Sequence, residues 1–126
     1  MKNIIKTPHA PKAVGPYNQA VELNGMLFVS GQVGLRPDDN VMVEGGIAEQ
    51  TEQVLKNIGS ILQDAGYNTG DVMFCTCMLT DLGKFNIFNE IYSRYFPNDS
   101  PARQTFESSA LPIGALVEIS CIAVKH

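Results

Sequence analysis

The sequence predicts an α+β fold, with one mixed β-sheet and two helices packed on one of its faces. Two long segments place apolar residues three and four positions apart, as amphipathic helices do, and shorter apolar runs around them have the character of strands. The expected order is strand–strand, short strand, helix, strand, helix, strand–strand, which does not alternate regularly. A length of 126 residues suits one domain that spans residues 1–126.

The first half of the chain predicts a hairpin and then a helix. Apolar runs at residues 17–23 and 26–31 are separated by Asn24-Gly25, and both residues of this dipeptide tolerate the positive φ of a type I′ turn. Residues 34–46 are expected to form a loop with a short extended piece at residues 41–43. A helical repeat of apolar residues begins at Ile47, and we expect the helix to end at Gly66 as its C′ residue.

The second half predicts a buried strand, a second helix and a final hairpin. Residues 71–80 form a continuous apolar run, which is typical of a strand covered on both faces. Residues 83–96 repeat apolar side chains at helical spacing, with Asp81 as a candidate N-cap. Two more strands are expected at residues 103–109 and 115–124, paired as a hairpin through the turn at residues 111–114.

The expected sheet is apolar on both faces, which has a consequence for assembly. In the strand at residues 71–80, Met73, Cys75, Cys77 and Leu79 would lie on one side, and the other side is also largely apolar. Two helices can cover only one face of the sheet. We therefore expect the second face to be buried against other copies of the chain, which makes a site between subunits plausible.

Charge and composition limit the classes of partner. The net charge of −4 argues against a broad nucleic-acid or anionic-membrane surface, which calls for a basic excess. The first residues lack the apolar stretch of a signal peptide, and no apolar run approaches the roughly 20 residues that span a bilayer, so a cytoplasmic location is expected. Three cysteines are expected to be free, buried thiols. No metal site is predicted, because the only histidines, His9 and His126, lie near the chain ends.

Arg103 and Glu118 are the candidate functional pair. Glu118 is a carboxylate within an otherwise apolar strand, and Arg103 begins the strand before it. Paired across a cleft, the two groups would hold an anion and a water molecule. Each residue also has an ordinary explanation, Arg103 as a solvated or salt-bridged arginine and Glu118 on a wet strip of the sheet. Neither a nucleophilic Ser-His-Asp or Cys-His set nor a glycine-rich phosphate loop can be assembled.

Several motifs, in the same order, resemble those of the RidA family, the reactive-intermediate deaminases also known as YjgF-like or L-PSP proteins. The resemblance covers almost the whole chain, from about Pro8 to Val124. It rests on Gly15-Pro16-Tyr17-x-Gln19-Ala20, Ser30-Gly31-Gln32, Gln50-x-x-Gln53-x-Leu55-x-Asn57-Ile58, Pro101-Ala102-Arg103, Leu111-Pro112 and Val117-Glu118-Ile119.

The resemblance implies a fold, an activity and a set of site residues. The fold would be chorismate-mutase-like, as a homotrimer with sites in the clefts between subunits. The activity would be hydrolysis of short 2-imino acids or their enamine tautomers to 2-keto acids and ammonia, by a hydrolase that needs no metal or organic cofactor. Arg103 would bind the substrate carboxylate and Glu118 would orient or activate the attacking water. The remaining pocket positions would be Tyr17, Ser30, Gly31, Asn89 and Thr105.

Two departures from the family pattern concern the strand of Arg103. Thr105 stands where the family often has cysteine, which puts thiol-based regulation in doubt, and Phe106 begins a bulkier, more polar segment than usual. By alternation, Phe106 is expected to point away from Arg103. Two other functions stay open: an endoribonuclease or translation inhibitor, and a non-catalytic trimer that binds small carboxylates.

Overall fold

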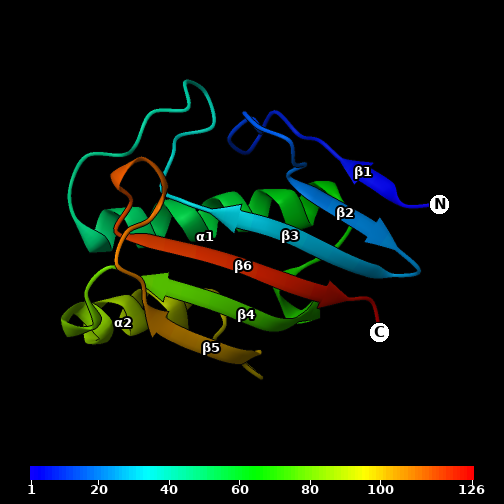
Figure 1. Cartoon of the computed structure of the whole chain (residues 1–126). Helices are drawn as coiled ribbons and strands as arrows, with labels where there is room; N and C mark the ends of the chain where they lie inside the picture. The colour runs from blue at the N-terminus through cyan, green and yellow to red at the C-terminus, as the bar shows by residue number, and fades with distance from the viewer.

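A six-stranded mixed sheet forms one layer of the computed structural model, which describes all residues from Met1 to His126 (Figure 1). The spatial order of the strands is β1-β2-β3-β6-β4-β5, and every neighbouring pair is antiparallel except β4 and β5, which are parallel. The strands are β1 (Asn3–Ile5), β2 (Ala20–Leu23), β3 (Met26–Gln32), β4 (Val72–Leu79), β5 (Ala102–Glu107) and β6 (Val117–Val124). The mixed α+β class expected from the sequence is confirmed.

Two helices, α1 (Ile47–Asp64) and α2 (Phe85–Tyr95), lie on one face of this sheet (Figure 1). The predicted end of the first helix is confirmed, since Gly66 follows the C-cap residue with a φ of +85°. Three short 3₁₀ turns complete the chain at Thr69–Asp71, Leu82–Lys84 and Pro112–Gly114. Neither these turns nor the two helices are long and apolar enough to cross a membrane.

The hairpin of β2 and β3 is confirmed. Asn24 and Gly25 have φ values of +52° and +76°, as a type I′ turn requires, and β2 pairs with β3 in register around them. Val41–Val43 was expected to be extended, and Met42 does form an isolated bridge with Leu35. The short strand β1 at the edge of the sheet was not predicted.

The prediction that the last two strands form a hairpin is wrong, because β5 and β6 are not neighbours in the sheet. Strand β4 lies between them, with Cys75 paired to Arg103 of β5 on one side and to Cys121 of β6 on the other. The physical reason is that β4 is apolar on both faces and takes a central position, while α2 returns the chain as a crossover that makes β5 parallel to β4.

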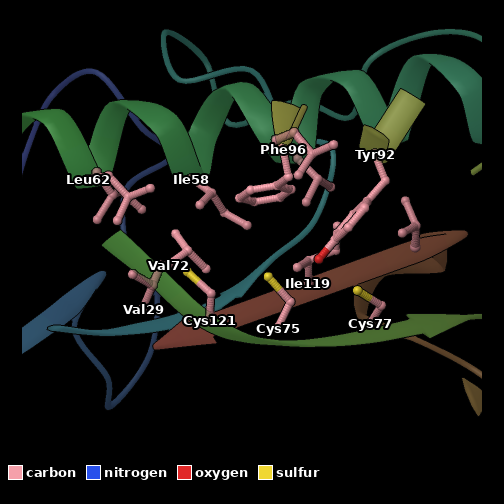
Figure 2. Packing of buried hydrophobic residues seen from close by; sticks show 14 of the residues in the cluster. Val29, Ile58, Leu62, Val72, Cys75, Cys77, Tyr92, Phe96, Ile119 and Cys121 are labelled. Atoms are coloured by element: carbon pink, nitrogen blue, oxygen red, sulfur yellow. The ribbon is translucent and has the colours of Figure 1, made fainter. Parts of the chain in front are cut away.

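The core fills the space between the sheet and the helices. Figure 2 shows Val72, Cys75 and Cys77 of β4 and Cys121 of β6 pointing at α1 and α2. The three cysteines are free and buried, as expected. Met73 is a correction, because a register shift between Val72 and Phe74 turns it outward, 41% exposed, and puts Val72 in the core in its place.

The other face of the sheet is covered by no element of this chain (Figure 1). Large apolar side chains on it remain well exposed: Met26 at 38%, Phe28 at 41% and Phe106 at 39%. Phe106 therefore points away from the helices, as alternation predicted. The burial of this face against other copies stays a prediction.

The buried side chain of Gln19 fixes the N-terminal arm that precedes β2. Its Oε1 accepts a hydrogen bond from the Thr7 amide at 2.7 Å, and its Nε2 donates to the carbonyls of Thr7 at 3.0 Å, Ala10 at 3.3 Å and Pro11 at 2.8 Å. Gln19 is only 3% exposed, so water cannot take the place of its side chain as the hydrogen-bond partner of these backbone groups. One amide thus satisfies the backbone of an otherwise irregular segment.

We expect Gln19→Ala to lower the free energy of unfolding by about 3 kcal/mol, since it leaves buried backbone groups without partners. Urea denaturation monitored by circular dichroism measures this loss. Gln63→Ala, at an exposed position of α1, is the matched control and should change stability by no more than about 0.5 kcal/mol. Equal effects in the two variants would contradict the role assigned to Gln19.

Candidate functional site

Arg103 lies on the helix side of β5 and has no carboxylate partner. Its Nη1 donates a 2.7 Å hydrogen bond to Oδ1 of Asn89 in α2, which is a neutral acceptor. The other two arginines differ, because Arg36 pairs with Asp39 and Arg94 with Glu90. The interpretation of Arg103 as a salt-bridged surface residue therefore does not hold, and Asn89 has a specific partner in Arg103. A half-buried guanidinium with unused donors is suited to bind an anion.

A cleft of about 340 Å³ opens beside this guanidinium. It is lined by Asn89, Tyr92, Ser93, Ser100, Pro101 and Arg103. Thr105, two positions after Arg103 and on the same face, pairs in register with Cys77, and its buried hydroxyl has no hydrogen-bond partner. We refer to Arg103, Asn89 and Thr105 as the arginine cluster.

The cysteines beneath the arginine cluster are not nucleophiles. Burial raises the pKa of Cys77 to about 12 and also raises the pKa of Cys75, so both thiols are neutral at physiological pH. A neutral thiol attacks carbonyl or imine carbons poorly, because the thiolate is the nucleophile. Nor do three or more His, Cys, Asp or Glu side chains come together as a set of metal ligands.

Glu118 lies on the opposite face of the sheet from Arg103. Arg103 is paired in register with Cys75, and Cys75 is paired with Cys121, so these three side chains lie on the same face of the sheet. Glu118 precedes Cys121 by three residues. Because side chains alternate along a strand, this odd separation puts Glu118 on the other face. The expectation that Arg103 and Glu118 face each other across one cleft is therefore wrong within a single chain. Partial burial raises the pKa of Glu118, because the charged carboxylate is poorly solvated there.

Glu118 belongs to a second cluster, with Tyr17, Ser30 and Gly31, which we call the glutamate cluster. A register shift between Val29 and Gln32 displaces Ser30 and Gly31 from the regular ladder of β3 and β6. A Cβ atom at Gly31 would lie only 2.9 Å from Cδ of Glu118. The side chain of Glu118 therefore occupies the space beside the backbone of Gly31.

Ser30 and Tyr17 are placed by the segment before β2. The Ser30 amide donates to the Gln19 carbonyl at 3.0 Å, and its hydroxyl donates to the Asn18 carbonyl at 2.5 Å. The Tyr17 side chain lies beside Gly15, is 48% exposed and borders hollows on both of its sides. The hydrogen bonds of Gln19 hold this segment, so the glutamate cluster depends on a buried amide that the sequence analysis did not single out.

Sequence reasoning also missed Tyr92, which lines the arginine cleft. Its ring centroid lies 4.8 Å from Cζ of Arg103. In the sequence, Tyr92 is one of the apolar side chains that repeat at helical spacing within residues 83–96. The available signal was its position three residues after Asn89, which puts both side chains on neighbouring parts of one helix face.

Gly31→Ala should lower the free energy of unfolding by about 1–3 kcal/mol, because the added methyl group overlaps the Glu118 carboxylate. Gly59→Ala is the matched control, since a Cβ there meets no atom within 4 Å, and it should raise stability by about 0.5–1 kcal/mol. Thermal and urea unfolding measure both. In a Glu118→Ala background the cost of Gly31→Ala should disappear; an undiminished cost would mean that the strain lies elsewhere.

Comparison with known proteins places the chain in a family. Residues 7–125 match the family described as Endoribonuclease L-PSP. The chloroplastic Reactive Intermediate Deaminase A of Arabidopsis thaliana is 48% identical over 97% of this chain, which spans 65% of that protein. The 2-iminobutanoate/2-iminopropanoate deaminase of Mus musculus is 44% identical, with 99% of this chain and 93% of the mouse protein covered.

Solved structures agree with these relatives. A candidate endoribonuclease from Thermotoga maritima superposes with a TM-score of 0.97 at 44% identity, covering 100% of this chain and 99% of that one. Escherichia coli TdcF, solved with bound serine, superposes with a TM-score of 0.94 at 35% identity, covering 98% and 99%. The chain therefore belongs to the RidA family of imine deaminases, also described as the L-PSP endoribonuclease family.

Proposed function

We propose that this protein, as a cytoplasmic homotrimer, hydrolyses 2-iminobutanoate and 2-iminopropanoate to the 2-keto acids and ammonia. The observation that carries the proposal is the guanidinium of Arg103, which is half-buried beside a cleft and has only the neutral Asn89 as hydrogen-bond acceptor. Relatives named as deaminases of these two imino acids support it. The serine bound to TdcF, itself a small molecule with a carboxylate, is consistent with an anion-binding site in this fold.

Arg103 and Glu118 would have separate tasks in this reaction. The fork of N–H donors on Arg103 would hold the substrate carboxylate and fix the imine carbon in place. Glu118 would accept a proton from water as the water oxygen adds to that carbon. Returning that proton to nitrogen gives the carbinolamine. Transfer of the remaining hydroxyl proton to nitrogen then breaks the C–N bond and releases ammonia as the carbonyl forms, so no oxidant and no cofactor is consumed. A carboxylate with a raised pKa suits both transfers, because it gains and loses a proton nearer to neutral pH.

We infer that a complete site needs two subunits. The arginine and glutamate clusters lie on opposite faces of one sheet, so one chain cannot bring them to the same substrate. The glutamate cluster adjoins the uncovered apolar face, where Phe28 and Phe106 are well exposed. Packing this face against another copy would bury those side chains and could bring the partner's arginine cluster to the carboxylate of Glu118.

The alternative of an endoribonuclease rests on the family description and not on the geometry. The net charge of −4 disfavours the phosphate contacts on which RNA affinity depends. His9 contacts Asp64 and His126 contacts Asp71, so neither histidine is in the arginine or the glutamate cluster. Non-catalytic carboxylate binding is the other alternative, and the next experiment separates it from hydrolysis.

We expect the wild-type protein to accelerate formation of 2-ketobutyrate when 2-iminobutanoate is generated in situ by a threonine dehydratase. Arg103→Ala should abolish the acceleration, and Glu118→Ala should lower it by about 10²–10⁴-fold. Arg94→Ala, which alters an exposed arginine of α2 paired with Glu90, is the matched control and should leave the rate unchanged. If the wild type only matches the buffer rate while still binding 2-ketobutyrate, the protein is a binding module and the proposal fails.

Mixing two inactive variants tests the split site. When Arg103→Ala and Glu118→Ala proteins are unfolded together and refolded as mixed trimers, some interfaces join an intact Arg103 to an intact Glu118 from different chains. Random mixing in equal amounts should restore about one quarter of the wild-type activity per site. The separately refolded variants are the control. A mixture as inactive as its parents would place both groups in a single chain.

The pH dependence should report the raised pKa of Glu118. Water activation needs the ionised carboxylate, so kcat/KM should fall as pH decreases through this pKa, at a pH above the ordinary value of 4.5. Glu118→Gln should remove this acid limb and leave a low, flat profile. The profile is measured with stopped-flow detection of 2-ketobutyrate. An acid limb that persists in Glu118→Gln would assign the titration to another group.

A further inference from the structure

Three aromatic side chains of α2 converge on the guanidinium of Arg103. Its Cζ lies 5.5 Å from the ring centroid of Phe85, 5.9 Å from that of Phe88 and 4.8 Å from that of Tyr92. These residues are three and seven positions apart, which puts them on one face of the helix. We call them the aromatic cage. All three distances are within the roughly 6 Å at which a ring face attracts a cation.

Unlike an ion pair, the aromatic cage leaves the charge and the N–H donors of Arg103 available to a substrate. A carboxylate beside Arg103 would neutralise its charge and occupy the donors that a substrate needs. None of the salt bridges of the chain joins a carboxylate to Arg103. Ring faces attract a guanidinium through their quadrupoles and accept none of its in-plane N–H bonds. The aromatic cage can therefore fix Arg103 while leaving its charge uncompensated.

Tyr92 contributes through its ring more than through its hydroxyl. The ring is the nearest of the three to Arg103, and Tyr92 is 6% exposed. Its hydroxyl oxygen is directed from α2 toward the sheet (Figure 2), where burial and the Cys75 thiol raise the pKa of Tyr92. Arg103 donates its side-chain hydrogen bond to Asn89 and not to this hydroxyl, so the hydroxyl does not anchor the arginine. The contribution of Tyr92 to holding the guanidinium, beside that of Asn89, therefore comes from its ring.

We propose that Phe85, Phe88 and Tyr92 are positioning residues that pre-organise Arg103 for the substrate carboxylate, with Tyr92 as the main one. This rests on the proposed function, in which Arg103 binds that carboxylate. A free arginine side chain loses much rotamer freedom when it binds a ligand, and a cage that orders it beforehand removes that loss from the binding step. The cage should thus act on substrate affinity more than on the chemical step.

The chain offers a matched control at Phe96. This residue is buried to a similar degree, 5% exposed against 6%, and its ring contacts that of Tyr92 at a tilt of 45°, with centroids 4.9 Å apart. Phe96 is not among the rings over Arg103. Tyr92→Leu and Phe96→Leu both shorten a buried aromatic side chain in the same cluster, but only the first removes a ring face from the guanidinium.

The experiment compares steady-state kinetics with 2-iminobutanoate and binding of 2-ketobutyrate in these variants. We expect Tyr92→Leu to raise KM and the Kd for 2-ketobutyrate about five- to tenfold, with kcat changed by no more than about twofold. Tyr92→Phe should restore wild-type values, because it keeps the ring. Phe96→Leu should leave KM and Kd unchanged although it lowers the melting temperature. Equal KM increases in Tyr92→Leu and Phe96→Leu would reduce the cage to core packing and overturn the proposal.

A second readout does not depend on turnover. The ¹⁵N order parameter of Arg103 Nε should fall in Tyr92→Leu and stay high in Tyr92→Phe and Phe96→Leu. An unchanged order parameter in Tyr92→Leu would contradict the proposal even if the enzyme is active. If the wild type shows no deaminase activity, the order parameters and 2-ketobutyrate binding still decide the role of the cage. Phe85→Leu, at the partly buried first residue of α2, replaces Tyr92→Leu if the latter does not fold.

Discussion

The parallel pairing of β5 with β4 is the constraint on which the arginine cluster depends. It brings Arg103, on the edge strand β5, level with Cys75 of β4, on the side of the sheet that α2 covers. The crossover that makes this pairing contains α2 itself, so one connection supplies the arginine, the Asn89 that accepts its hydrogen bond and the aromatic rings above it. A hairpin of β5 and β6 would have put Arg103 beside the wrong neighbours.

The two charged groups of the proposed site both lack a partner of opposite charge within the chain. Arg103 is bonded only to the neutral Asn89, and burial raises the pKa of Glu118 with no cation to oppose it. A charge removed from water without a counter-charge destabilises the folded chain. Each of the two groups therefore lowers the stability of the folded chain locally, on opposite faces of the sheet. A ligand or a neighbouring copy of the chain that supplies the opposite charge would stabilise each of them.

Local patterns were enough to predict both helices and every strand except β1, but the nonlocal pairing of the last strands was predicted wrongly. Asn24-Gly25 and Gly66 have positive φ values that only a few residue types adopt readily, so the turn and the helix end could be located from the sequence. The partner of β5 depends on how the apolar strand β4, which is distant in the sequence, is buried in the sheet. No pattern within β5 itself predicts this. The outward turn of Met73 has the same origin, because a bulge shifts the side of every residue before it.

The site residues were predicted better than their arrangement. Motif resemblance identified Arg103 and Glu118, but counting faces within each strand could not relate the two, since the relation depends on the strand order across the sheet. Gln19 and Tyr92 were passed over for a different reason. A buried amide and a helix aromatic look like ordinary packing in a sequence, and only their contacts give them a role.

Supporting contacts of this kind explain how a site can change residues and keep its geometry. Thr105 replaces the cysteine frequent in the family, yet the nearest cysteine, Cys77, is a buried neutral thiol whose pKa is raised to about 12. The proposed chemistry, in which Arg103 binds the carboxylate and Glu118 transfers the protons, assigns no step to a thiolate at the position of Thr105. What it needs is an arginine held without neutralisation and a carboxylate with a raised pKa. The rings of α2 lie around Arg103, and partial burial raises the pKa of Glu118, whose side chain fills the space that a side chain at Gly31 would take.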